Sequence, residues 1–342
     1  MMQKYFTNLF ISIVAEDNSY KVFCKAIKNS KQKDKFEKIF PVKANAEFLN
    51  KDLEDYLISL QDKYNFAYIA FLLDSMGQGA VKGVQAEDFT KFNVDFKNIK
   101  SVKFDTWSAY ASFIDINWLH KKYSKVGLDF IYSPFALLYT LLAEHKLKIK
   151  STLYLLNQKD SVTLAVFKEG TLDFGVFYKI IIEDGLDSAE SVENWEEEEE
   201  AQGVENLATL DEESQADDEM MDLSELDTLD DDLQSEEFLN TDGTQGTVDY
   251  KDEEDDDEGM EDIALYGRDL HIFRFLNRAL KEYYNNPTYE SDFIENMVIF
   301  DGYDMSKEII QSLEEDLYLD LEMHKIDVSE MVCDMSIKEI YD

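Results

Sequence analysis

One segment, Asp187 to Asp262, constrains the folding of this chain more than any other feature of its sequence. It carries 34 acidic residues against a single basic one, Lys251, and includes an unbroken glutamate run from Glu196 to Glu200. A segment of this kind has too little apolar surface to offset the conformational entropy lost on ordering. We therefore expect a disordered acidic insertion inside an otherwise folded protein.

The rest of the chain has an ordinary composition. The whole chain has a formal charge of −41, but only 40 acidic and 32 basic residues lie outside the acidic segment. The 23 phenylalanines and 19 tyrosines are sufficient for a large core, and the length suits two lobes. The excess of negative charge repels phosphate backbones, so nucleic acid is not expected as a partner.

The cysteines and the hydropathy pattern indicate a cytoplasmic protein. Cys24 and Cys333 stand far apart, and neither belongs to a CxxC motif, so the sequence predicts no disulfide framework and no zinc site. The four histidines also lack metal-ligand spacing. We find no leader pattern and no apolar run of about 20 residues, so direct membrane insertion is not expected.

Alternating apolar residues predict the same arrangement of strands twice. A first meander covers Leu9 to Val42, and a leucine-lined helix from Leu49 to Tyr64 and a strand from Tyr68 to Leu73 follow it. A second meander covers Thr152 to Ile182. After the acidic segment we expect, in order, a helix at Tyr266–Tyr283, a strand at Phe293–Phe300, a helix at Met305–Leu317 and a last strand at Tyr318–Met323.

The stretch from Gly77 to Gly127 has a looser pattern and predicts a small inserted subdomain. It shows short strands near Ser101 to Phe104 and Ser108 to Phe113, and a helix near Asn117 to Lys125. Gly77-Gln78-Gly79 lacks the third glycine of a dinucleotide loop, so we interpret it as a flexible entry. The expected organisation is lobe I (1–78), small subdomain (79–127), lobe I helix and crossover (128–150), lobe II meander (151–186), acidic insertion (187–262) and the rest of lobe II (263–342).

This order predicts an α/β protein with the duplicated, two-lobed actin-like fold, whose lobes are of the ribonuclease-H type. The resemblance extends to one family of that fold. The segments Ser108 to Phe113, Trp118 to Tyr123 and Ser133 to Leu138 resemble the end of the small subdomain of the PilM family. Arg268 to Tyr284, followed by Met297 to Gly302, resembles that family's late helix, strand and glycine turn. The cell-division protein FtsA and, more remotely, the cytoplasmic part of GspL share this order of elements.

The PilM resemblance implies a function in assembly. It implies a non-catalytic cytoplasmic scaffold, peripheral at the inner membrane, that binds the cytoplasmic tail of a PilN-like inner-membrane protein. The machine would be a type IV pilus, a type II secretion system or a flagellar-motor-associated assembly, and self-association stays open. Within the small subdomain, the aromatic residues that could hold such a partner are Trp107, Tyr110, Phe113 and Trp118.

The turns that hold nucleotide in this fold are degraded here. Nucleotide-binding members place an Asp-x-Gly turn in each meander, where backbone amides face the phosphates. The corresponding positions of this chain are Asp17, Asn157, Asp160, Asp301 and Gly302, and only the last is a glycine. Side chains in place of clustered glycines obstruct the approach of phosphate, so we expect neither a catalytic residue nor a cofactor, and ATP with Mg²⁺ is disfavoured.

Two other functions remain open at this point. One is an actin-family nucleotide-binding ATPase with rearranged loops, and the other is an acidic chaperone-like binding protein in which the insertion is the active part. Within the insertion, leucines recur at helical spacing, which fits either a solvated linker or a segment that folds on a partner. They are Leu223, Leu226, Leu229 and Leu233.

Overall fold

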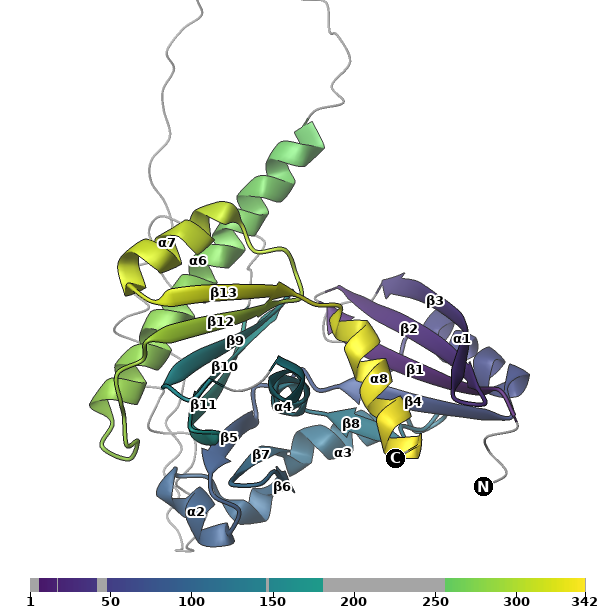
Figure 1. Cartoon of the computed structure of the whole chain (residues 1–342). Coiled ribbons are helices and arrows are strands. Elements are labelled where there is room, and N and C mark those ends of the chain that lie inside the picture. The colour runs from purple at the N-terminus through teal and green to yellow at the C-terminus, as the bar shows by residue number, and fades with distance from the viewer. Residues whose placement is uncertain (1–5, 17, 42–47, 146–147, 181–255, 342) are drawn as a thin grey trace, which may run out of the picture. The chain divides into compact units, whose positions relative to one another are not determined.

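Two five-stranded sheets form the framework of the protein (Figure 1). The computed structural model describes residues 6–16, 18–41, 48–145, 148–180 and 256–341. The lobe I sheet has the order β3-β2-β1-β4-β8, with β1 antiparallel to β2 and parallel to β4. Its strands are β1 (Asn8–Glu16), β2 (Ser19–Lys28), β3 (Lys31–Pro41), β4 (Phe66–Leu72) and β8 (Phe130–Tyr132).

The lobe II sheet repeats this plan strand for strand. Its order is β11-β10-β9-β12-β13, with β9 antiparallel to β10 and parallel to β12. Its strands are β9 (Thr152–Gln158), β10 (Ser161–Lys168), β11 (Thr171–Lys179), β12 (Asn296–Asp301) and β13 (Asp320–Lys325). An antiparallel meander followed by two parallel strands, present twice, confirms the predicted actin-like fold class.

Amphipathic helices cover one face of each sheet. Helix α1 (Lys51–Lys63) begins where the Asn50 side chain accepts a hydrogen bond from the Asp52 amide, and it buries Leu53, Leu57 and Leu60 against lobe I. Helix α3 (Phe113–Lys122) packs on the same core through Leu119. In lobe II, α6 (Asp256–Asn285) and α7 (Lys307–Leu317) play the equivalent part.

Two helices fill the space between the sheets. Helix α4 (Pro134–His145) is apolar on most sides and buries four leucines among residues of both lobes, as expected for a helix enclosed by two layers. Helix α8 (Val328–Tyr341) follows the last strand of lobe II and yet packs on the lobe I sheet (Figure 1). Cys333 lies against Phe10 and Phe23, and Ser12 Oγ donates to the Ser329 carbonyl at 2.6 Å. Each lobe therefore depends on a segment of the other half of the chain.

Helix α8 was not predicted, because we placed the last element at Tyr318–Met323. Its buried positions include Ser329, Cys333 and Ser336, which give no leucine-like periodicity. Small polar side chains suit this interface because the helix lies close to the strands, where a larger residue would not fit.

The small subdomain is more regular than predicted. It is a three-stranded sheet, in the order β5-β7-β6, with a short helix that the sequence analysis did not anticipate. Its elements are β5 (Gln78–Lys82), α2 (Ala86–Lys91), the 3-10 turn η2 (Phe96–Asn98), β6 (Ile99–Lys103) and β7 (Trp107–Ser112). The expected flexible entry at Gly77-Gln78-Gly79 was wrong. Gln78 and Gly79 are paired in β5, and a Cβ on Gly79 would meet Tyr110 Oη at 2.5 Å.

The small subdomain also contacts lobe II. Lys82 on β5 pairs with Asp173 on β11 at 3.0 Å, and a Cβ added to Gly175 would lie 2.8 Å from the Ala80 Cβ. Strands β5 and β11 therefore approach so closely that a glycine is required at this point.

Two further boundaries differ from the sequence analysis. The helix expected near Asn117 begins at Phe113, where the Ser112 side chain caps it. Helix α6 begins at Asp256, before the expected end of the acidic insertion at Asp262. Residues 181–255 lie outside the described residues, so the acidic insertion stays a prediction there. Among the described helices, none combines the length and apolar character needed to cross a membrane.

Substitution of Leu138 by Ala should destabilise both lobes together. Leu138 is 1% exposed and lies in the core that α4 shares with both sheets. Loss of three buried carbons from such a site costs about 2–5 kcal/mol of unfolding free energy. Urea unfolding followed by tryptophan fluorescence would measure this loss, with Ile58→Ala on the outer side of α1 as the control. A loss no greater than that of the control would contradict the shared core.

Candidate functional site

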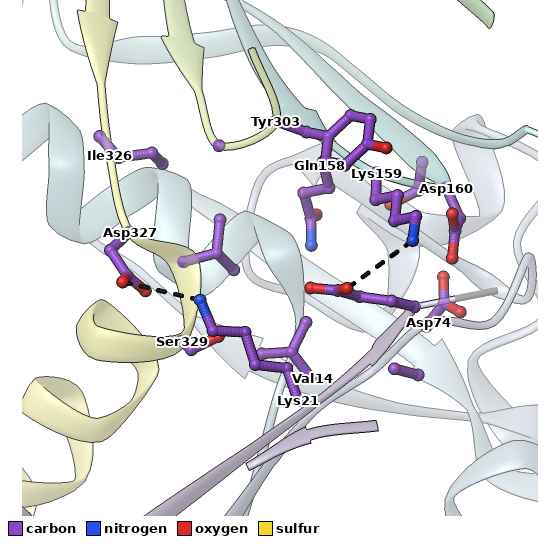
Figure 2. Close-up of a pocket in the computed structure, with 15 residues that line it drawn as sticks. Val14, Lys21, Asp74, Gln158, Lys159, Asp160, Tyr303, Ile326, Asp327 and Ser329 are labelled. Carbon is purple, nitrogen blue, oxygen red and sulfur yellow. Dashed lines mark ion pairs between the residues drawn. The ribbon is translucent and has the colours of Figure 1, made fainter. Parts of the chain in front are cut away.

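A small cavity lies between the lobes, where the hairpins of the two meanders face each other (Figure 2). Its volume is about 130 Å³. Lobe I lines it with the ends of β1 and β4, and lobe II lines it with the β9–β10 turn and the segments after β12 and β13. These turns include positions at which the sequence analysis predicted a degraded nucleotide cleft.

Ion pairs across the lobes close this cavity. Asp74, just after β4, pairs with Lys179 on β11, and Lys159 in the β9–β10 turn lies 4.0 Å from Glu16 at the end of β1. Lys21 of lobe I lies 3.8 Å from Asp327, which precedes α8 (Figure 2). Each of these three lysines therefore has a carboxylate partner across the lobes, and none is left as a free cation for an anionic ligand.

Burial disfavours the charged form of two carboxyl groups that line the cavity. Burial raises the pKa of Asp74 to about 6, although the neighbouring Lys179 acts in the opposite direction. Burial also raises the pKa of Glu16, while Lys159 and Lys21 partly offset it. In both groups desolvation of the carboxylate outweighs the attraction of its lysine partner.

A buried arginine holds the β9–β10 turn behind the cavity. Arg268 donates from Nη2 to Asn157 Oδ1 and from Nε to the Lys159 carbonyl, both at 2.6 Å, and also to the Gln158 carbonyl. Its other partner is Asp269, at 3.0 Å. Burial lowers the pKa of Arg268, while Asp269 opposes this shift. A guanidinium is suited to this position because it presents several donors in one plane.

Two of the predicted nucleotide-cleft residues meet in the same buried network. Asn157 Nδ2 donates to Asp301 Oδ1 at 2.7 Å, and Asp301 Oδ2 accepts from the Met305 amide at 3.1 Å. Asp269 accepts from the Ser306 amide at 2.8 Å. The side chains of Asn157 and Asp301 are thus engaged in fixing the turn after β12, and neither residue lines the cavity.

The other predicted cleft residues are placed differently. Asp160 and Gly302 line the cavity, and Asp17 lies outside the described residues. A Cβ on Gly302 would lie 2.6 Å from Val328 Cγ2 and 2.9 Å from the Asn157 carbonyl oxygen. The glycine is therefore needed for the contact between this turn, β9 and α8. This packing explains it without any phosphate.

The geometry leaves little room for a nucleotide. Pockets that hold small-molecule ligands generally measure about 300–1,000 Å³, more than twice the 130 Å³ found here. Within the described ranges, no three His, Cys, Asp or Glu side chains converge in a way that could hold a metal ion. The arrangement can tie the two lobes together through its ion pairs.

The four aromatic residues proposed to bind a partner separate into two groups. Trp107 is only 2% exposed and packs between Phe104 and Phe167 in the core between the lobes. Tyr110 is half-buried and contacts Phe89. Phe113 and Trp118 are 41% and 46% exposed on α3. The two on α3 are the more accessible, and the leucines at 223–233 lie outside the described residues.

Sequence reasoning missed the residues that close the cavity. Asp74, Lys179 and Arg268 belong to no motif, and their partners are distant in sequence. A signal did exist for Arg268, because all three arginines of the chain lie within residues 268–278. When the arginines of a lysine-rich chain all lie in one helix, they indicate a site that needs several hydrogen-bond donors in one plane.

The two sheets, the helices between them and the closed cavity define a two-lobed actin-like protein. The chain belongs to the family described as a domain of unknown function, DUF8341, whose model matches residues 153–341. A second model, also described as a domain of unknown function (DUF8569), matches residues 6–139. No curated protein matches the chain.

Several solved structures are similar to the chain over nearly its whole length. A Bacteroides thetaiotaomicron protein with an actin-like ATPase fold and unknown function is 11% identical, with 98% of this chain and 96% of that chain covered and a TM-score of 0.43. A PilM-PilN type IV pilus biogenesis complex is 12% identical, with coverages of 96% and 94% and a TM-score of 0.48. A ROK family protein from Streptococcus pneumoniae, in complex with sucrose, is 10% identical, with coverages of 98% and 99% and a TM-score of 0.38.

The titration of Asp74 should lower the stability of the protein as pH rises. The folded-state pKa of about 6 exceeds the ordinary value of 3.8, so the folded state binds more protons between these values. The free energy of unfolding should therefore fall from about pH 4 to pH 6 and then level off. Urea midpoints across this range should show a shallower fall for Asp74→Asn.

Glu16 provides a second test of the same effect, because burial raises its pKa as well. In the double variant Asp74→Asn with Glu16→Gln, the free energy of unfolding should change even less with pH. Equal slopes in the wild type and both variants would contradict desolvation as the dominant cause.

Substitution of Gly302 by Ala should destabilise the fold by about 1–3 kcal/mol, because the added methyl overlaps Val328 and the Asn157 carbonyl. Adding Val328→Ala removes the contact with the side chain but leaves the contact with the backbone. Chemical unfolding should therefore show that the double variant recovers only part of the stability lost in Gly302→Ala. Complete rescue, or no loss in the single variant, would show that the turn can shift away from β9.

Proposed function

We propose that the chain is a non-catalytic scaffold of the PilM type, cytoplasmic and peripheral at the inner membrane. It binds the short cytoplasmic tail of a PilN-like inner-membrane protein, in a type IV pilus, type II secretion or flagellar-motor-associated assembly. The region that receives the tail is the small subdomain, residues 79–127. The proposal rests on the resemblance of this subdomain to PilM in the order and spacing of its segments, and on the ion pairs across the cavity.

The observation that carries the non-catalytic part is the set of cross-lobe ion pairs. Asp74 with Lys179, Glu16 with Lys159 and Lys21 with Asp327 occupy the place where an actin-like ATPase holds phosphate. A nucleotide would have to break these pairs and leave their charges unpaired, which costs several kcal/mol for each partly buried group. A scaffold gains from the same pairs, because they fix the relative position of its lobes.

The attachment of the small subdomain supports the scaffold role as well. Lys82 and Asp173 join it to lobe II, while α3 packs on lobe I. A subdomain held from both sides can present a binding surface with little loss of conformational freedom on binding.

Calorimetry with Mg-ATP separates the scaffold from an actin-family ATPase. The scaffold should give no heat of binding at micromolar concentrations of the full chain. The matched control is the variant Asp74→Ala with Glu16→Ala, which frees Lys179 and Lys159. If the pairs close the cavity, this variant should gain weak heat at millimolar ATP. Micromolar binding by the wild type would contradict the proposal.

Affinity capture from the native cell tests the tail partner. The tagged full chain should be recovered in the membrane fraction together with an inner-membrane protein that has a short cytoplasmic tail. Deleting residues 187–254 discriminates the chaperone alternative, since a scaffold keeps this partner and an acidic chaperone loses its binding. Recovery of the full chain only in the soluble fraction would contradict the scaffold.

A further inference from the structure

A surface of unusual composition covers β6 and α3, and we call it the β6–α3 surface. Three apolar side chains on α3 face outward, with Ile114 74% exposed beside Phe113 and Trp118. Val102 on β6 is exposed as well. Contiguous exposed apolar side chains of this size mark interaction sites more often than free surface.

Two lysines lie against these apolar side chains, and three more are close to them in the sequence. Between Phe96 and Tyr123 the chain carries five lysines and two aspartates, whereas the whole chain has more than twice as many acids as bases. Lys100 Nζ lies 5.1 Å from the centre of the Phe113 ring, and Lys122 Nζ lies 4.6 Å from that of Trp118. The five lysines are Lys97, Lys100, Lys103, Lys121 and Lys122.

These lysines have no carboxylate partner among the residues that the structure describes. Elsewhere, lysines are paired within the fold, as Lys82 is with Asp173 and Lys125 is with Glu54. In a chain so rich in acids, five neighbouring lysines without ion pairs form a local positive field, which extends about 8 Å at physiological ionic strength. The surface is therefore complementary to an anionic ligand.

Strand β6 adds a third feature. It is an edge strand of the three-stranded sheet, so one side of its backbone has no strand partner within the described part of the chain. Lysines on an edge strand prevent pairing with another neutral strand. They favour a segment whose side chains carry the opposite charge.

We propose that the β6–α3 surface binds a peptide segment of a second protein in which acidic residues flank apolar anchors. The anchors contact Ile114, Phe113 and Trp118, and the acidic residues pair with the surrounding lysines. A short peptide fits because it covers only this surface. An anionic membrane or a nucleic acid extends well beyond it and meets a chain in which acidic residues outnumber basic ones 40 to 32 even outside Asp187 to Asp262.

This partner differs from the membrane-protein tail of the proposed function. Cytoplasmic stretches next to a membrane span are enriched in Lys and Arg, which the five lysines repel, so the tail of the proposed function occupies a part of the small subdomain other than the β6–α3 surface. The two proposals therefore succeed or fail separately, since membrane recovery tests the tail and peptide binding tests the β6–α3 surface.

The probe for the test is a fluorescent synthetic peptide with the sequence of residues 219–240, which is acidic and carries four leucines at helical spacing. Fluorescence anisotropy with the full chain should show saturable binding that weakens as salt is raised. A peptide with serine in place of the leucines should bind at least about tenfold more weakly. Absence of saturable binding, or binding that is insensitive to salt, would overturn the proposal.

Variants of the full chain locate the binding site. Lys100→Glu with Lys122→Glu, and separately Trp118→Ala, should each weaken peptide binding about tenfold or more. The matched control is Lys28→Glu with Lys31→Glu, two exposed lysines at the β2–β3 turn that also lack an ion pair in the described residues. Equal losses in the control and the β6–α3 variants would overturn the assignment to this surface.

Two further experiments test whether the β6–α3 surface binds something other than a peptide of a second protein. Binding to vesicles that contain phosphatidylglycerol, if lost in Lys100→Glu with Lys122→Glu, would replace the peptide by a membrane. The second arm uses a full chain whose Asp and Glu residues within 219–240 are changed to Asn and Gln. If only this chain binds the peptide, the occupant is the chain's own acidic segment, and the partner in a second protein is overturned.

Discussion

Burial of apolar surface between the two sheets is the interaction on which the rest of the structure depends. Helix α4 contributes its leucines to both sheets, and α8 returns from the end of lobe II to the lobe I sheet. Neither lobe has a complete core without the other, because Phe10 and Phe23 would be open to water without Cys333 and its neighbours. The spacing of the sheets is thus set by side-chain packing, and the hairpins above them are brought to a fixed separation.

The cross-lobe ion pairs follow from that separation. At this separation Lys159 in the β9–β10 turn reaches Glu16 at the end of β1, and Asp74 after β4 reaches Lys179 on β11. Ion pairs that are still partly open to solvent contribute little on their own, yet these three lie around one cavity and resist the same movement of the lobes. An actin-like framework is here combined with a small cavity crossed by ion pairs. The proposed function uses this fold as a rigid support, in keeping with the general independence of fold and function.

The strands were predictable from the sequence because each meander alternates apolar and polar residues, and the leucine spacing of α1 is equally clear. What the sequence lacked was any local sign of long-range contacts. Helix α8 buries Ser329 and Ser336, and β5 begins with Gln78 and Gly79, so neither shows the expected periodicity. Asn157 and Asp301, both predicted as degraded cleft positions, bond to each other, and neither lines the cavity. Their role was not predictable, since it depends on Arg268, which is more than a hundred residues from Asn157.

The approach of β5 to β11 has a consequence for how such chains can vary. Ala80 and Gly175 belong to segments matched by two different family models, yet the Cβ of a larger residue at 175 would overlap Ala80. A change of size at either position must be compensated at the other, and the same holds for the charges of Lys82 and Asp173. Exchanging one half of the chain between relatives would therefore break this junction unless the residues at both positions matched in size and charge.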